Sequence, residues 1–340
     1  MNKRFTLASL AIVLGICAFI FFTQTQVISV SRPAVQAQSA YGVRAVKNVR
    51  VQNYNALGEN ISYYDKVPQR VIAVGEQINE TLVALGVEQN VICPVRYGNP
   101  FYKPEPQYAT GYNKIKFQDN VVLNMENVLS MQPDLIISGQ VLYADKKLKS
   151  TDFWNKRGIH TYVSTNANSP TSHTKKETLE QECDFILGLG TIFDKEKEAK
   201  KIVADMQQYI ALVREKTQAM PKRKVMIIEM LGKNIVAYDS TKLAGDICVK
   251  LGADVPNFSS GTIGLETIIE ENPDVLFVVQ SGGNPEKAAD FFRQHPGLQS
   301  LKVVRDGKVY GISLNYTYNS AIKTGEGIKK FAHGIYPELF

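Results

Sequence analysis

Short apolar runs alternate with stretches of helical spacing from about residue 67 onward. Residues 67–74 hold the first apolar run, residues 77–85 favour a helix, and residues 91–93 are apolar again. Gly86 follows the first helix directly and can adopt the left-handed conformation that ends helices. Because solidly apolar strands belong to sheets covered on both faces by helices, the alternation predicts an α/β fold with parallel sheets.

An internal repeat relates the two halves of the chain. Residues 125–137 and 265–277 align without a gap, 140 positions apart. Each copy has a glutamate, Glu126 or Glu266, at the start of a short helix, a Pro-Asp pair seven residues later, and then an apolar strand. Proline disfavours a helical conformation at the residue before it, so it ends the helix. A period of this length predicts two similar α/β lobes and not a solenoid.

Two helices are predicted between the copies of the repeat. Residues 175–189 and 195–217 carry apolar side chains at helical spacing. Gly188 and Gly190 are expected to break the first helix, and Met220-Pro221 ends the second. The second half then continues with a strand at 225–228, a helix at 243–251, a helix that begins at Asn284-Pro285, a strand at 309–312 and a closing helix at 320–333.

The N-terminal segment has the pattern of an export signal. Two basic residues, Lys3 and Arg4, precede an almost wholly apolar run at 7–23, and small residues near Ala37 suit cleavage after it. The run is also long enough to stay as a membrane anchor, and Cys17 weakly resembles a lipidation site, although the bulky Ile16 precedes it. We predict a signal peptide at 1–37, with an anchor as the alternative, and a linker at 38–60.

Composition and charge exclude several classes of protein. The chain is 44% hydrophobic and 21% charged, which is typical of a globular protein and not of a disordered one. The net charge of +6 includes three positive charges in the N-terminal segment, so the remainder is too weak to indicate a nucleic-acid partner. The four histidines and the cysteines show no metal-ligand spacing, so no direct metal site is expected. A haem ligand among the tyrosines or histidines stays an alternative.

The ordered set of these features resembles the periplasmic siderophore- and cobalamin-binding family, the substrate-binding components of ABC importers. The resemblance rests on residues 67–74, Leu85-Gly86, both Glu…Pro-Asp segments, Leu251-Gly252 and residues 295–298, 304–310 and 335–340. It implies two Rossmann-like lobes, at 61–170 and 195–340, joined by a single long helix at 171–194, with a ligand cleft between them. It implies a monomer that takes a ferric-siderophore-type chelate, or alternatively cobalamin or haem, to an ABC permease, with no cofactor and no chemistry on the ligand.

The resemblance also gives the repeat glutamates a role, since an exposed glutamate on each lobe pairs with permease arginines in that family. Glu126 and Glu266 occupy the matching positions. The alternative is that each carboxylate only stabilises the positive end of its helix, an effect worth about 0.3–1 kcal/mol.

Ligand contacts are expected beyond the carboxyl ends of the strands, where open α/β sheets bind their ligands. Arginine and lysine would complement an anionic chelate, and tyrosine and tryptophan offer flat apolar area with a polar tip. Core packing or solvated surface is the alternative for each. The candidates are Glu76, Arg96, Tyr97, Tyr143, Trp154, Arg157, Met230, Tyr238, Tyr316, Tyr318 and Lys323.

An enzyme is the rival class, because two α/β domains around a cleft also occur in dehydrogenases and glycosyltransferases. The first strand is followed by Val74-Gly75-Glu76 and not by a dinucleotide-binding glycine pattern. The sequence also has neither a phosphate-binding P-loop nor a Gly-x-Ser-x-Gly nucleophile turn. We therefore do not expect catalysis.

Overall fold

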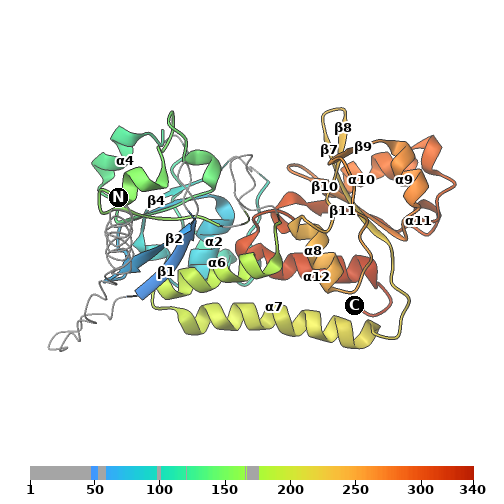
Figure 1. The fold of residues 1–340 in the computed structure, drawn as a ribbon, viewed down its shortest axis with the longest axis horizontal. Coiled ribbons are helices and arrows are strands. Elements are labelled where there is room, and N and C mark those ends of the chain that lie inside the picture. Colours follow the sequence, from blue (N-terminus) through green and yellow to red (C-terminus); the bar gives the residue numbers. More distant parts are fainter. Residues whose placement is uncertain (1–46, 53–58, 98–100, 120, 165, 167–175) are drawn as a thin grey trace, which may run out of the picture. The chain divides into compact units, whose positions relative to one another are not determined.

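Two β-sheets organise the chain, one in each half (Figure 1). The computed structural model describes residues 47–52, 59–97, 101–119, 121–164, 166 and 176–340, and residues 46–340 form one compact unit. The predicted signal peptide or anchor at 1–37 lies outside the described residues. Within the described ranges, no helix is both long enough and apolar enough to cross a membrane.

The first sheet is fully parallel, with strand order β4-β3-β5-β6. Its strands are short and apolar, as the sequence predicts. They are β3 (Val71–Val74), β4 (Val91–Val95), β5 (Leu135–Ile137) and β6 (His160–Tyr162). The helical segments of this half are α2 (Glu76–Ala84), η1 (Glu88–Asn90), α3 (Ala109–Tyr112), α4 (Met125–Met131), η2 (Gln140–Leu142) and α5 (Thr151–Asn155).

The second sheet is mixed, with strand order β11-β10-β7-β8-β9. The strands β7 (Val225–Leu231), β10 (Val275–Gln280) and β11 (Val309–Ser313) are parallel, while β8 (Asn234–Ala237) and β9 (Thr262–Ile263) extend the sheet antiparallel. The sequence pattern predicts parallel strands alone. It gives no signal for the β7–β8 hairpin, because β8 has only four residues, lacks a solid apolar run and follows a turn at the left-handed Gly232.

The helices of the second half match the predicted pattern with small shifts. They are α8 (Leu243–Lys250), α9 (Leu265–Glu271), α10 (Pro285–Gln294), η3 (Pro296–Leu298), α11 (Lys302–Arg305), η4 (Leu314–Tyr316), η5 (Ala321–Lys323) and α12 (Thr324–Ile335). Asn284 caps α10 as predicted, because its side chain accepts a hydrogen bond from the Glu286 backbone N–H.

Two helices connect the sheets, namely α6 (Leu179–Ile192) and α7 (Glu196–Thr217). The prediction that Gly188 and Gly190 break α6 is wrong. A Cβ at Gly188 would lie 1.9 Å from the Tyr162 hydroxyl, and one at Gly190 would lie 2.5 Å from the Ala199 Cβ. Both glycines therefore permit close packing inside a continuous helix. α7 packs on α6 and on α12, and α6 in turn contacts β1 of the first half and η5 and α8 of the second (Figure 1).

The two halves share one hydrophobic core. One cluster covers one face of each sheet and runs through α6 and α7, from Val71 and Ala73 to Val225 and Phe277. Two further clusters lie on the other faces, one within each half. A shared close-packed core resists shear between the halves, because displacing it would open voids.

A β-hairpin precedes the first sheet, in a region where the polar sequence predicts a linker as far as residue 60. β1 (Lys47–Gln52) and β2 (Glu59–Tyr64) pair antiparallel. Val49 and Tyr64 are buried in the shared core, while Tyr63 is exposed. Alternation over so few residues, in a polar region, gave too weak a period-two signal to predict a strand.

The repeat predicted from the sequence has the same geometry in both copies. Residues 122–137 and 262–277 share the same order of buried, half-buried and exposed positions. Asp134 accepts hydrogen bonds from the backbone of Gln69 and Arg70, at 2.8 and 2.9 Å, and Asp274 accepts one from that of Lys224, at 2.9 Å. Each aspartate therefore ties the start of its strand, β5 or β10, to the start of the neighbouring strand, β3 or β7.

Candidate functional site

The carboxyl ends of β3 and β4 bring three of the predicted residues together. Gly75 adopts φ +121°, a conformation that suits glycine, and so turns the chain from β3 into α2. The adjacent Glu76 is buried, and its carboxylate accepts a hydrogen bond from the Tyr97 backbone N–H at 3.0 Å. Arg96 is exposed, stacks over the Phe117 ring and pairs with Asp119 at 2.6 Å.

Two exposed aromatic rings follow β4. The Tyr97 side chain is 52% exposed and that of Phe101 is 59% exposed. Phe101 also lies close to the other half of the molecule, since a Cβ added to Gly282 would lie 3.4 Å from its ring. Gly282 follows β10, so segments beyond the carboxyl ends of strands in the two sheets meet here.

The second half contributes a buried carboxylate near the end of β7. The Tyr238 hydroxyl donates a hydrogen bond to Glu229 at 2.6 Å. Burial raises the pKa of the Glu229 carboxyl. Met230 is half-buried against the core of this half, and Tyr318 is half-buried in the segment after β11.

Lys323, predicted as a ligand contact, lies in a buried ion cluster between the halves. Its side chain is 1% exposed, and its ammonium lies 2.7 Å from Glu105 and 3.3 Å from Glu80. It also donates to the Lys103 backbone oxygen at 2.6 Å. The charge is thus satisfied inside the protein, which removes this residue from the set available to an anionic ligand.

Tyrosine hydroxyls donate further hydrogen bonds to the carboxylates of Glu80 and Glu105. The Tyr102 hydroxyl donates to Glu80, whose other oxygen accepts from the Glu105 backbone N–H at 2.7 Å. The Tyr316 hydroxyl donates to Glu105 at 3.3 Å. Burial raises the pKa of Glu80, and the Lys323 charge opposes that shift. Tyr316 is therefore a residue of this junction as well.

The two residues before Lys323 also bind the first half through their backbone. The Ala321 N–H donates to Glu182 of α6 at 2.6 Å, and the Ile322 N–H donates to the Thr81 hydroxyl of α2 at 3.3 Å. Ala321 has φ +47°, an unfavourable conformation for a residue with a Cβ. The surrounding contacts hold this strained segment in place.

Three predicted ligand residues lie elsewhere, and their assignment is corrected. Trp154 and Tyr143 are buried in the core of the first half, where their polar atoms donate to the backbone oxygens of Leu148 and Ile136. Arg157 is exposed but folds back on the preceding helix α5, over the Phe153 ring and onto the Phe153 backbone oxygen at 2.9 Å. The expected site residues were placed by their order along the chain, which does not show which face of the lobe they occupy.

The repeat glutamates, Glu126 and Glu266, are both exposed, one on α4 and one on α9. Figure 1 shows both helices on the side of their sheets away from α7. Glu266 folds back over the backbone of Gly264, where a Cβ would lie 2.0 Å from its carboxylate. In the first half, Asn124 caps the equivalent helix with its side chain.

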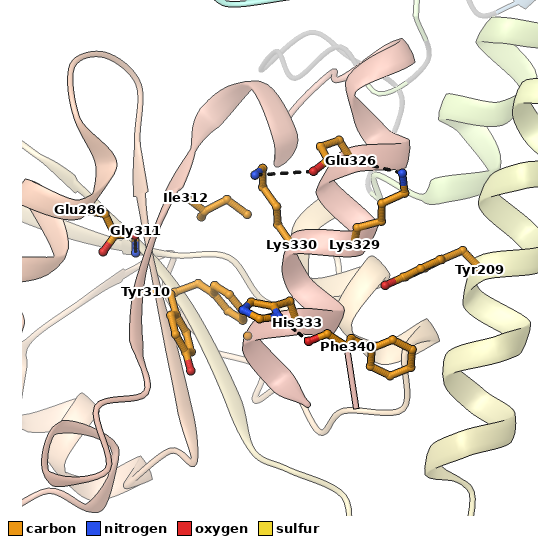
Figure 2. A pocket seen from close by; sticks show the side chains of 12 residues that line it. Tyr209, Glu286, Tyr310, Gly311, Ile312, Glu326, Lys329, Lys330, His333 and Phe340 are labelled. Carbon is orange, nitrogen blue, oxygen red and sulfur yellow. Dashed lines mark hydrogen bonds and ion pairs between the residues drawn. The ribbon is translucent and has the colours of Figure 1, made fainter. Parts of the chain in front are cut away.

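A separate pocket of about 370 Å³ lies between β11, α12 and α7. Figure 2 shows Lys329 and Lys330 paired with Glu326, and His333 bonded to the backbone oxygen of Phe340. Its lysine charges already have carboxylate partners, and it faces the middle of β11 and not the strand ends. It is therefore a weaker candidate for the main ligand site.

Among the described residues, no group of three or more His, Cys, Asp or Glu could hold a metal ion.

The sequence pattern did not predict four residues of the junction and the strand ends. Phe101 lies beside a Pro and a Tyr in a segment without periodicity, and nothing local marks it. Glu80 and Glu105 acquire their role from Lys323, more than 200 positions later in the chain. Glu229 interrupts the apolar run of β7, and an acid within a buried strand was the one signal that could have identified it.

The chain belongs to the periplasmic binding protein family, whose model matches residues 71–315. An iron-uptake system-binding protein of Bacillus subtilis is 28% identical over 198 residues, 55% of this chain and 57% of that protein. A solved periplasmic binding protein of Veillonella parvula is 29% identical with a TM-score of 0.78, covering 86% of this chain and 92% of that one. An ABC-type Fe³⁺-hydroxamate transport protein of Saccharomonospora viridis shares the fold, with a TM-score of 0.63, 20% identity and coverage of 81% and 96%.

The Lys323→Met variant tests the ion cluster. Removing the ammonium leaves Glu80 and Glu105 buried without a counter-charge, so we expect the free energy of unfolding in urea to fall by about 3–5 kcal/mol. The matched control is Lys329→Met on α12, because Lys329 is exposed and its pair with Glu326 is long, at 3.6 Å. That change should stay within about 0.5 kcal/mol. Equal effects of the two variants would contradict a buried structural role for Lys323.

The pH dependence of stability tests Glu182. Burial raises the pKa of this carboxyl to about 7 from its ordinary 4.5. The folded state therefore holds a proton that the unfolded chain has lost, and wild-type stability falls as pH rises between these values. Relative to wild type, Glu182→Gln should gain up to about 3 kcal/mol across this range. The measurement is urea unfolding from pH 4 to 8, with the exposed Glu198→Gln as control, and a constant difference would disprove the shift.

Proposed function

We propose that the protein is the extracytoplasmic solute-binding component of an ABC importer and that it captures a ferric-siderophore-type chelate between its lobes. The observation that carries the proposal is the pair of exposed aromatic rings after β4, Tyr97 and Phe101, with Phe101 against Gly282 of the other sheet. We place the lobes at residues 61–170 and 195–340, on either side of a connecting segment at 171–194.

The chemistry of a ferric chelate suits this position. Such a ligand brings its own donor atoms for the iron, so the protein needs a complementary surface and not metal ligands. Flat, partly aromatic chelates pack well on exposed aromatic rings, which lose little conformational freedom on binding. The iron-uptake relative in Bacillus subtilis and the Fe³⁺-hydroxamate protein of the same fold support this class of ligand.

In this proposal, Arg96 is the main residue whose positive charge complements an anionic chelate. Lys323 is buried in the ion cluster and the Arg157 guanidinium lies over Phe153 of α5, so neither adds charge at the strand ends. The Arg96 guanidinium is exposed and its partner Asp119 is exposed too, so the pair can open toward an anionic ligand. Cobalamin or haem, which are also large and flat, remain the alternative ligands for the same surface.

The permease is the proposed partner, and Glu126 and Glu266 are the proposed contacts with it. Each is exposed on its own lobe, and the two occupy equivalent places in the repeat. An anionic group on each lobe suits a membrane partner that offers a cationic group at two places, since opposite charges favour correct docking.

Calorimetric titration tests the ligand assignment. We expect one class among ferric catecholates, ferric hydroxamates and ferric citrate to bind with a submicromolar Kd, equivalent to about −8 kcal/mol or better. The iron-free form should bind more weakly. Heat is the preferred signal because the single tryptophan, Trp154, is buried in the first lobe away from the proposed site.

Variants locate the binding surface in the same assay. Tyr97→Ala and Phe101→Ala should each weaken binding roughly tenfold, as expected for truncating an aromatic anchor. Tyr63→Ala, an exposed tyrosine on the hairpin, is the matched control and should leave the Kd unchanged. Tight binding of haem or cobalamin alone would replace the chelate, and no binding across the panel would overturn the proposal.

The double variant Glu126→Ala/Glu266→Ala tests docking. Transport of the labelled ferric chelate into cells that carry the importer should fall to background, because both anionic contacts are lost, while the Kd for the chelate stays at the wild-type value. Glu198→Ala on α7 controls for the removal of an exposed carboxylate elsewhere. Loss of chelate binding, or undiminished transport, would contradict the assignment of Glu126 and Glu266 as docking residues.

A further inference from the structure

Each repeat glutamate has an exposed aliphatic side chain one helical turn away. Leu129 on α4 is 39% exposed and Ile269 on α9 is 44% exposed. Both lie three residues after the glutamate, so each shares a helix face with it. The two pairs, Glu126 with Leu129 and Glu266 with Ile269, occupy equivalent places in the two copies of the repeat.

The opposite face of each helix is anchored, which fixes the direction of these side chains. Val128 and Ile268, one position earlier, are fully buried in the separate cores of the two lobes. Both helices end in a left-handed residue, Gln132 or Asn272, directly before the Pro-Asp turn that the two copies of the repeat share. Each surface pair is therefore presented on a rigid support.

Duplication distinguishes this feature from ordinary surface composition. A single exposed leucine is common on soluble proteins and needs no explanation. Here the following positions are polar, Ser130 in one copy and Glu270 in the other, whereas the position after the buried residue is aliphatic in both. The internal repeat thus places a carboxylate and an apolar side chain together on both lobes, on the side of the sheets away from α7 (Figure 1).

We propose that Leu129 and Ile269 are the apolar anchors of the permease-docking surface, each inserting into a recess beside the cationic group that receives the neighbouring glutamate. This rests on the proposed role in ABC import. Two like patches fit a partner that presents the same surface twice, which is a pair of identical or homologous membrane subunits. An apolar contact at the centre of each patch excludes water from the ion pair and so strengthens it.

Transport with matched variants tests the anchors. The double variant Leu129→Asn/Ile269→Asn should reduce uptake of the labelled ferric chelate at least tenfold, with an unchanged Kd for the chelate by calorimetry. The control is Leu212→Asn/Val249→Asn, since these aliphatic residues are similarly exposed, at 41% and 43%, but lie on α7 and α8. Uptake by the control should match wild type.

The outcomes distinguish failure of the apolar anchors from failure of the proposed docking to the permease. If Glu126→Ala/Glu266→Ala abolishes uptake while Leu129→Asn/Ile269→Asn does not reduce it, the apolar anchors are refuted and the docking glutamates stand. If neither double variant reduces uptake, both the anchors and the proposed docking face are wrong. A tenfold loss shared by the α7–α8 control would also refute the anchors, because the effect would then follow from any lost surface aliphatic.

Site-specific photocrosslinking gives a direct reading of proximity. A benzoylphenylalanine at position 129 or 269, in cells that carry the full importer, should crosslink to an ABC permease subunit identified by its peptides. The same group at position 212 should not. Crosslinking to the permease from position 212 but not from 129 and 269 would place the docking face elsewhere and overturn the inference.

Discussion

Lys323 carries a positive charge into the junction between the two lobes, and the fold has to satisfy that charge there. It does so with Glu80 of α2 and Glu105 of the segment after β4, both from the opposite lobe. A buried ammonium and buried carboxylates are each unfavourable alone, so the three residues are stable only together. Their mutual dependence fixes where η5 meets the first lobe, and the neighbouring bonds from Ala321 to Glu182 and from Ile322 to Thr81 follow from that position.

This junction determines what the strand ends can do. The chain segment that supplies Tyr102 and Glu105 to the cluster also carries Phe101, which reaches Gly282 of the other lobe. Polar groups inside the junction and exposed aromatic rings beside it thus come from one stretch of chain. Together with the shared core along α6 and α7, this arrangement favours small adjustments around a ligand over a wide opening of the lobes.

The internal repeat gives the protein a second organising constraint, on its outer surface. After each short helix, the aspartate of the Pro-Asp turn ties the following strand to its neighbour in the same way, through Asp134 and Arg70 in one lobe and Asp274 and Lys224 in the other. Because the supports are equivalent, the exposed side chains above them are presented equivalently. A binding protein that must be read by a two-part membrane partner can obtain both contact surfaces from one duplicated structural unit.

The sequence by itself determined the fold class, the succession of the main helices and strands and the repeat, because these follow from local periodicity and from the turn chemistry of Gly and Pro. The resemblance to the family, which rests on the same ordered motifs, implied exposed positions for Glu126 and Glu266, and both are exposed. The interpretation of Gly188 and Gly190 as helix breakers was wrong. These positions are glycine because Tyr162 and Ala199, from other elements, approach the helix closely there.

Only the tertiary structure decided which aromatic and charged residues are available at the strand ends. Trp154 and Tyr143 had the composition of ligand contacts but fill the first lobe's core, and Lys323 had the charge of one but is neutralised by carboxylates more than 200 positions away in the chain. Periodicity shows which side of an element is buried, but not which distant group lies opposite. Partners of a buried charge are chosen by long-range packing, and that information first exists when the two lobes meet.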